Sequence, residues 1–233
     1  MGAFGDTPEP RESEMKFKLG VLLAVAGLLA LAPTVTRANN IAYSFSGCPD
    51  SGPCSGAIAS SVTYTSGGIT ITATGYSTAS TTTVNTTTAL YIKTDAGDEH
   101  GLGISSPDAD HEIEPGQFIQ LTLTNLANAG VDTGNLFLGS VQSGEEYKIC
   151  EGGSAGVMGT VNCITGGLDE TAVPLSWSKS DPYIDITVPT DKGDVLVSSL
   201  TSTPEPGTAG LMLLGISAMM LITLRRRFAS STN

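Results

Sequence analysis

Basic residues are scarce in the middle of this sequence. Between residues 39 and 206 there are 19 acidic and only 4 basic residues, a net charge of −15, against −12 for the whole chain. Such a surface repels the phosphates of nucleic acids and anionic lipid headgroups, so we exclude nucleic acid as a partner. The acidic excess favours solubility outside a cell, and it would also tolerate divalent cations or neutral glycans.

Helical periodicity and zinc-ligand spacing are also missing. No stretch between residues 39 and 203 repeats its apolar residues with the period of a helix, which excludes a helical core. The chain has only two histidines and four cysteines, and no C-x-x-C pair occurs among them. A zinc site is therefore disfavoured, and we expect no cofactor.

Alternation of apolar and polar residues is present instead, and it predicts strands. The clearest cases are Ile69–Thr74, Ile119–Thr124 and Tyr183–Val188. Further strands are expected at Ile41–Ser46, Ser61–Thr65, Ala89–Lys93, Leu136–Val141, Glu145–Ile149, Leu175–Ser178 and Val195–Leu200. Gly-rich turns separate them, so residues 39–203 are predicted to be all-β, a single jelly-roll-like β-sandwich with the apolar rows on its inner faces.

The four cysteines all lie in this acidic part. Cys48 and Cys54 enclose a short turn-rich loop, and Cys150 and Cys163 bracket a Gly-rich one. We expect the disulfides Cys48–Cys54 and Cys150–Cys163 in an oxidising compartment, although four cysteines allow three connectivities.

One stretch fits the pattern of a catalytic serine. Gly152–Gly156 matches G-x-S-x-G around Ser154, which in hydrolases lies between a strand and a helix. The residues after it, Val157–Val161, do not resemble a helix start, and Cys163 is expected to tie the loop back. A secreted serine hydrolase is thus the weakest of our hypotheses.

Two loops rich in carboxylates offer weak Ca²⁺ candidates. Asp95, Asp98, Asp108 and Asp110 lie close to the two histidines, His100 and His111. Calcium takes 6–8 oxygen ligands, but no D-x-D-x-D-G loop is present, so solvated turns are the preferred interpretation. Trp177 with Tyr183 would suit sugar stacking, although a lone Trp in a β-sandwich is more often part of the core.

Serine and threonine make up 17 of the 29 residues from Ser60 to Thr88. Thr suits the exposed face of a strand, which is the preferred explanation for Ser61–Gly75. For Ser77–Thr88 this explanation and O-glycosylation both stay open. The formal N-glycosylation sequon at Asn85 is discounted.

The beginning of the chain carries a secretory signal. Lys16 and Lys18 precede the apolar run Leu19–Ala32, and small residues follow up to Ala38, where we expect signal peptidase to cut after transport through the Sec translocon. A cut after Ala32 would leave Pro33 next to it and is disfavoured. The first fourteen residues are acidic, so Met15 is the expected start within the segment 1–38.

The end of the chain has three successive parts. Pro204, Glu205 and Pro206 stay extended because proline fixes its backbone angle. An uncharged apolar run, Ala209–Leu224, predicts a transmembrane helix, and Arg225, Arg226 and Arg227 hold its end in the cytoplasm. Both terminal signals therefore place residues 39–203 across the inner membrane.

This end, residues 204–233, resembles the PEP-CTERM sorting signal of Gram-negative bacteria, with the three parts in the required order. The resemblance implies processing by an exosortase, a membrane cysteine transpeptidase-like enzyme; the alternative is a membrane anchor that is never cut. Gly101–Ser105, Glu112–Glu114 and Gln117–Thr124 also resemble the "GLGV … EID … L-x-F" pattern of many exosortase-substrate ectodomains. Ile104 stands in place of Val and Glu114 in place of Asp.

These signals predict an exported surface or matrix protein without catalytic activity. It would be anchored transiently in the inner membrane, then reach the cell surface, with exopolysaccharide or biofilm as its setting. A glycan- or Ca²⁺-binding surface module is the alternative.

Overall fold

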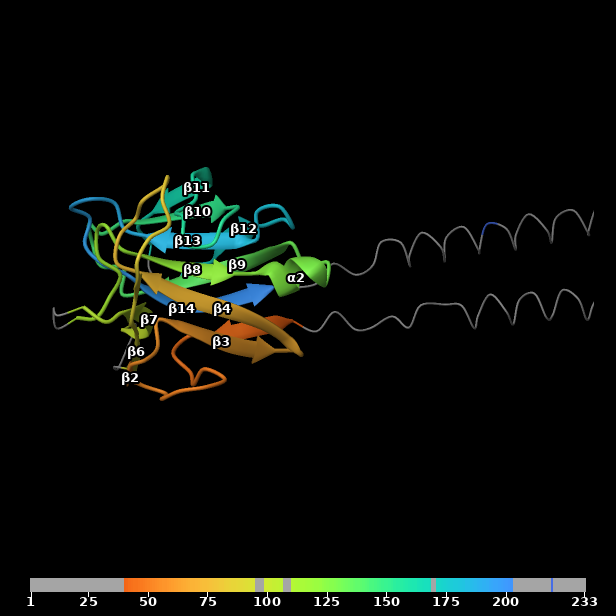
Figure 1. Ribbon diagram of the computed structural model, residues 1–233, viewed down its shortest axis with the longest axis horizontal. Coiled ribbons are helices and arrows are strands. Elements are labelled where there is room, and N and C mark those ends of the chain that lie inside the picture. Colours follow the sequence, from red (N-terminus) through yellow and green to blue (C-terminus); the bar gives the residue numbers. More distant parts are fainter. Residues whose placement is uncertain (1–39, 95–98, 107–109, 169–170, 203–218, 220–233) are drawn as a thin grey trace, which may run out of the picture. The chain divides into compact units, whose positions relative to one another are not determined.

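The computed structural model describes residues 40–94, 99–106, 110–168, 171–202 and 219 (Figure 1). The predicted signal peptide, 1–38, and all but one residue of the sorting segment, 204–233, lie outside the described residues. Within the described residues, no helix has the length and apolar character needed to span a bilayer. The transmembrane helix expected at 209–224 stays a prediction.

The described chain forms two antiparallel sheets, which confirms the all-β prediction and is compatible with a β-sandwich. Sheet A has the order β12 (Val173–Ser176), β9 (Thr133–Gly139), β14 (Leu196–Ser202), β7 (His100–Ile104), β6 (Leu90–Thr94) and β2 (Gly56–Ala57), and β1 (Ile41–Ser44) pairs with β14. Sheet B has the order β11 (Val161–Gly166), β10 (Tyr147–Gly152), β13 (Tyr183–Thr187), β8 (Phe118–Thr122), β4 (Ile69–Tyr76) and β3 (Ser61–Ser66), and β5 (Thr87–Thr88) pairs with β4.

The predicted apolar rows form the core between the two sheets. Ile71 and Ala73 of β4, Ile119 and Leu121 of β8, and Ile184 and Ile186 of β13 are all buried in one cluster. Leu136 and Leu138 of β9, in the other sheet, belong to the same cluster. Alternation places these residues on one face of their strands, so burying that face provides the main hydrophobic stabilisation of the domain.

The first and last strands of the described domain are neighbours. β1 runs antiparallel to β14, with Ile41 opposite Ser202 and Ser44 opposite Ser199. Residues 41 and 202, which are far apart in sequence, therefore lie side by side at one end of the domain.

Five elements were not among the predicted ones: the helix α2 and the strands β2, β5, β7 and β11. A short helix, α2 (Thr124–Asn128), follows β8 where the strand pattern was expected to continue to Thr124. It buries Leu126 and Ala127 against the core. β7 and β11 are strands, although the sequence pattern singles out the first only as part of the motif Gly101–Ser105 and the second only as the end of a Gly-rich loop at Cys163.

Glycine is required at position 103 because another segment crosses β7 there. A methyl group on Gly103 would overlap the backbone carbonyl of His111 and approach the Cα of Glu112 to 3.0 Å. Leu102 and Ile104 point into the core, so Gly103 faces outward and the segment containing residues 111 and 112 covers it. The family-like Gly-x-Gly therefore has a packing role.

Gly103→Ala should lower the free energy of unfolding by about 1–3 kcal/mol, because backbone rather than a flexible side chain must move aside. Urea unfolding of the oxidised domain, residues 39–203, measures this change. Gly47→Ala is the matched control, since its added methyl would meet nothing closer than 3.5 Å. Equal losses of stability in Gly103→Ala and Gly47→Ala would contradict the conclusion that the segment containing residues 111 and 112 crosses β7 at Gly103.

Candidate functional site

The residues of the two sorting signals lie outside the described part of the chain. They are Ala38 at the predicted signal-peptide cut and Pro204, Glu205, Pro206, Arg225, Arg226 and Arg227 of the C-terminal signal. Their roles stay predictions.

Both predicted disulfides are present. Cys48 is bonded to Cys54, and Cys150 is bonded to Cys163. The second closes the loop that carries Gly152–Gly156 and joins neighbouring strands β10 and β11. The described residues contain no free cysteine.

The Ca²⁺ candidates are described only in part. Asp95, Asp98 and Asp108 lie outside the described residues, and Asp110 is exposed. Among the residues that are described, no three His, Cys, Asp or Glu side chains are grouped so as to hold a metal ion. His111 stacks on Tyr91, with 3.9 Å between the ring centroids, so this histidine packs against a neighbouring aromatic ring.

A buried ion pair lies where residues 111 and 112 cross sheet A. The Lys93 ammonium is 2.6 Å from Oε1 of Glu112 and 2.7 Å from Oε2 of Glu99. The Ser140 hydroxyl also donates to Oε1 of Glu112, at 2.9 Å. Only 3% of Glu112 is exposed, and its second oxygen, Oε2, is buried without a hydrogen-bond partner.

The surroundings of this ion pair favour the protonated forms of both Lys93 and Glu112. Burial raises the pKa of Glu112 from 4.5 to about 7, although Lys93 and Ser140 oppose the shift, and nearby Asp194 adds to it. Burial alone would lower the pKa of Lys93, but its hydrogen bonds to Glu112 and Glu99 raise that pKa above 10.5. Lys93 therefore stays charged between two carboxyls, and Glu112 is the one that titrates near neutrality.

Ser154 lies in the loop that joins β10 to β11. Strand β10 ends at Gly152, as a nucleophile elbow would need, but residues 155–160 form a turn and irregular chain instead of a helix. Ser154 is exposed, and its backbone carbonyl accepts a hydrogen bond from Nε2 of Gln120. In the described structure no histidine or carboxylate hydrogen-bonds to its hydroxyl, so the catalytic geometry expected of G-x-S-x-G is not formed.

Two buried polar side chains hold this loop against the outer face of sheet B. Asp185 of β13 accepts from the backbone N–H of Gly159 at 2.6 Å and from Nε2 of Gln120 at 2.8 Å. Gln120 of β8 accepts in turn from the backbone N–H of Gly156 at 2.9 Å. Asp185 is fully buried, and no cation lies among its hydrogen-bond partners. Burial raises its pKa from 3.8 to about 7, although the hydrogen bonds from Gly159 and Gln120 lower it in part.

A second, smaller apolar cluster lies under the same loop. Tyr76 and Phe118 stack with their ring centroids 4.6 Å apart, and Cys150 and Met158 complete the cluster. Both faces of sheet B are therefore buried in this region: the inner face against sheet A and part of the outer face against loops.

The Ser/Thr-rich segment 77–86 packs beside this loop and is fixed by Asn85. The amide of Asn85 donates to the carbonyls of Ser80 and Gly156 and accepts from Thr78 and the Ser80 N–H. Only 6% of Asn85 is exposed, so its side chain is unavailable to a glycosyltransferase in the folded protein. The threonines at positions 81–83 are exposed.

Trp177 belongs to the core rather than to a sugar-binding surface. Only 3% of it is exposed, and its ring N–H donates to the carbonyl of Val131 at 2.7 Å. Tyr183 is half-buried on β13. The core alternative stated for Trp177 is therefore the correct one.

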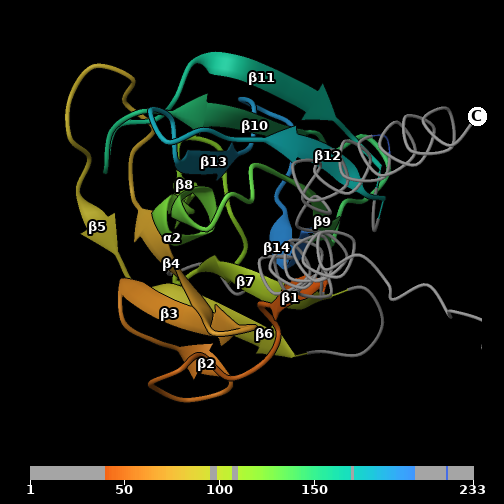
Figure 2. The same ribbon diagram turned by 90° about the vertical axis from the view of Figure 1, so that its right-hand side faces the viewer.

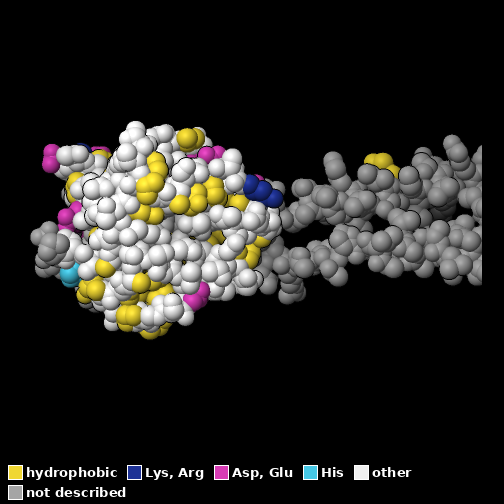
Figure 3. All heavy atoms as spheres, in the orientation of Figure 1, with side chains coloured by type: hydrophobic (Ala, Val, Ile, Leu, Met, Phe, Trp, Pro, Cys, Tyr) yellow, Lys and Arg dark blue, Asp and Glu magenta, His cyan; other side chains and the backbone are white. Residues whose placement is uncertain are grey.

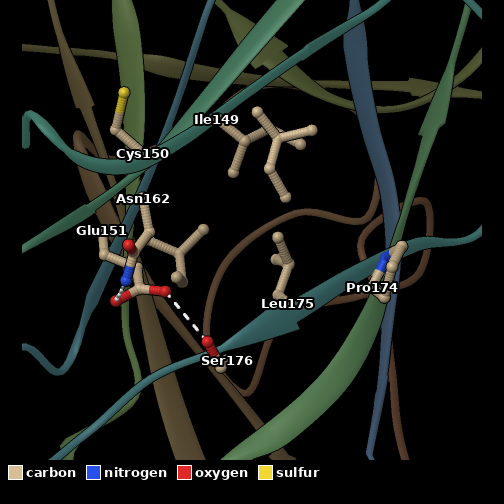
Figure 4. A pocket seen from close by; sticks show the side chains of 9 residues that line it. Ile149, Cys150, Glu151, Asn162, Pro174, Leu175 and Ser176 are labelled. Atoms are coloured by element: carbon tan, nitrogen blue, oxygen red, sulfur yellow. Dashed lines mark hydrogen bonds between the residues drawn. The ribbon is translucent and has the colours of Figure 1, made fainter.

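A small cavity opens between the strands at one margin of the two sheets. It has a volume of about 170 Å³ and is lined by residues of β10, β11, β12 and β13 (Figure 4). Ile149, Ile164 and Leu175 supply apolar walls. Glu151 lies at its rim, where one carboxylate oxygen accepts from the Ser176 hydroxyl at 3.0 Å and the other from Asn162 at 2.9 Å.

Local sequence patterns contain few signs that Asp185 and Glu112 are buried. Asp185 and Gln120 occupy positions that alternate with core residues, where an exposed side chain is expected, and they face each other across β13 and β8. An acidic residue between two isoleucines in a strand was the available signal for Asp185. Glu112 was singled out only as part of the motif Glu112–Glu114, and nothing indicated its burial, because its partners Lys93 and Ser140 are distant in sequence.

The buried carboxyl of Asp185 makes stability depend on pH. Its folded pKa is higher than its unfolded one, so the free energy of unfolding should rise as the pH falls from about 7 to about 4. Asp185→Asn should weaken that dependence and, by leaving the N–H of Gly159 or the Gln120 amide unpaired, cost about 1–3 kcal/mol at pH 5. Thermal unfolding between pH 4 and 8 measures both effects. Asp132→Asn, at an exposed position, should leave the wild-type profile unchanged.

Removing Lys93 should leave the buried carboxylate of Glu112 without a neighbouring positive charge. Lys93→Met is expected to cost about 3–5 kcal/mol at pH 8. The cost should be smaller at pH 5, where Glu112 takes up a proton. Urea unfolding at the two pH values tests this, with Lys179→Met at an exposed position as the control. If Lys93→Met lowered the free energy of unfolding equally at both pH values, Lys93 would be shown to act by packing alone.

Comparison of this chain with protein-family models, with curated proteins and with solved structures finds no significant match.

Proposed function

We propose that this chain is an exported, exosortase-sorted surface or matrix protein that acts without catalysis. The observation that carries the proposal is the succession at its C-terminal end: Pro204-Glu205-Pro206, the uncharged apolar run Ala209–Leu224 and Arg225–Arg227. An ordinary membrane anchor needs the apolar run and the arginines but has no use for the Pro-Glu-Pro element.

Two features of the domain support export. Both pairs of cysteines are joined as disulfides, which persist in oxidising compartments outside the cytoplasm. Ile41 and Ser202 pair across β1 and β14, so the two described strands nearest in sequence to the predicted signals are neighbours.

The surroundings of Ser154 and Trp177 support a role other than hydrolysis or sugar stacking. Ser154 lies in a loop whose backbone is held by Gln120 and Asp185, and Trp177 is part of the core. The proposal includes a jelly-roll-like sandwich as the finer classification of the two sheets. Its expected partners are the Sec translocon, signal peptidase, the exosortase and exopolysaccharide.

Mass spectrometry of the mature C-terminus tests the proposal. In a Gram-negative host with an active exosortase, the product should lack Arg225–Arg227 and end near Pro204–Pro206. The same chain in a strain without the exosortase should keep its tail, and so should a variant with Pro204, Glu205 and Pro206 all changed to Ala in the active strain. A tail that remains intact in both strains would refute exosortase processing.

A further inference from the structure

Six of the described strands pair with one neighbouring strand only, and the structure protects five of these edges. An edge strand presents unpaired backbone N–H and C=O groups that can pair with another chain. They are β1, β2 and β12 in sheet A, and β3, β5 and β11 in sheet B. Short length, proline, charged side chains, β-bulges and covering loops or side chains are the usual means of blocking such edges.

Each protected edge uses one of these means. β2 and β5 are only two residues long, and β12 contains Pro174, which has no N–H to offer. In β1 the N–H of Ala42 donates to the hydroxyl of Ser66. β3 is covered by the disulfide-closed loop 48–54, where Asp50 donates its backbone N–H to the carbonyl of Thr63 at 2.8 Å. The Asp50 carboxylate also accepts from the backbone N–H and the hydroxyl of Thr65.

β11 has little such protection. It is six residues long, Val161 to Gly166, with neither a proline nor a charged residue. It lies along one margin of the domain, at the top of Figure 2, and pairs with β10 on one side only. The pairing is irregular opposite Ile149–Glu151, near Asn162, which has a positive φ of 44°, but the register is regular from Ile164 to Gly166.

Exposed apolar side chains gather at the same edge. Four large hydrophobic side chains are exposed among the described residues, and two of them, Val161 at 48% and Leu168 at 67%, lie at the start of β11 and just beyond its end. The cavity of about 170 Å³ opens beside Ile164 of the same strand. This edge thus offers both backbone hydrogen bonds and apolar surface to an added strand.

We propose that β11 pairs antiparallel with β11 of a second copy of this chain, joining two B sheets into one continuous sheet. An antiparallel strand pair can obey twofold symmetry, so each copy offers the other the same uncharged strand. The stretch Gly152–Leu168 carries no charge, within a region whose net charge is −15. The outer face of sheet B beside it is also largely uncharged at its centre, with acidic side chains at the margins (Figure 3). Glu145 and Glu146 lie beside Thr165–Gly167, and Glu151 binds Asn162, but β11 itself adds no charge to the edge along which the two copies would pair.

Photo-crosslinking of the full-length chain, extracted in detergent, tests the pairing. Benzoylphenylalanine in place of Leu168 should yield a covalent dimer of twice the chain mass. The same residue in place of Val84, which is 76% exposed and lies in the segment 77–86, is the control and should yield little dimer.

A charge introduced into β11 distinguishes pairing through this edge from non-specific association of the domains. Thr165 is exposed, so Thr165→Lys should fold normally, yet two lysines brought together should reduce the Leu168 crosslink by roughly fivefold. Thr81→Lys, also at an exposed position, should leave it unchanged. Each of four results would overturn the proposal. Two concern the dimer: equal crosslinking at positions 168 and 84, or no dimer at either position. The other two are that neither lysine substitution changes the crosslink, or that position 168 crosslinks only to a chain of different mass. Because no arm of the test depends on cleavage of the tail, its outcome is independent of exosortase processing.

Discussion

Burying a carboxyl group is costly unless it is hydrogen-bonded, and the partners of two buried carboxyls fix the loops on both outer faces of the sheets. On sheet B, Asp185 and Gln120 bind the backbone of Gly156 and Gly159 and so hold the β10–β11 loop over a small apolar cluster. On sheet A, Glu112 is held by Lys93 and Ser140 where its segment crosses Gly103. Unpaired, each carboxylate would cost several kcal/mol.

The same constraint explains why motif-like stretches carry no evident chemistry. In the G-x-S-x-G stretch, the N–H of Gly156 donates to Gln120, and a methyl at Gly152 would come within 2.9 Å of the Asp185 carboxylate. The family-like Gly-x-Gly on β7 allows another segment to cross it. In both places the glycines are needed for close approach of backbone, and such approach by itself implies no ligand.

Sequence patterns predicted the features that depend on neighbouring residues. Alternation identified Ile71, Ile119 and Ile184 as core residues, and loop spacing identified both disulfides. Alternation failed at Leu123, where the row Ile119-Leu121-Leu123 appeared to extend the strand but Leu123, Leu126 and Ala127 already follow the spacing of a helix. It failed again at Gln120 and Asp185, because a loop more than 25 residues away from either covers the face that was expected to be exposed.

By itself, the sequence determined the all-β class, the inner rows and the two cysteine pairings, because each depends on side-chain period or on short loops. Tertiary structure alone decided which strands are neighbours. It thereby set Asp185 opposite Gln120, placed Glu112 beside Lys93, joined Ile41 to Ser202 and left β11 at an open edge. These outcomes depend on contacts between residues distant in sequence, and a local pattern of apolar and polar residues does not specify which distant strands pair.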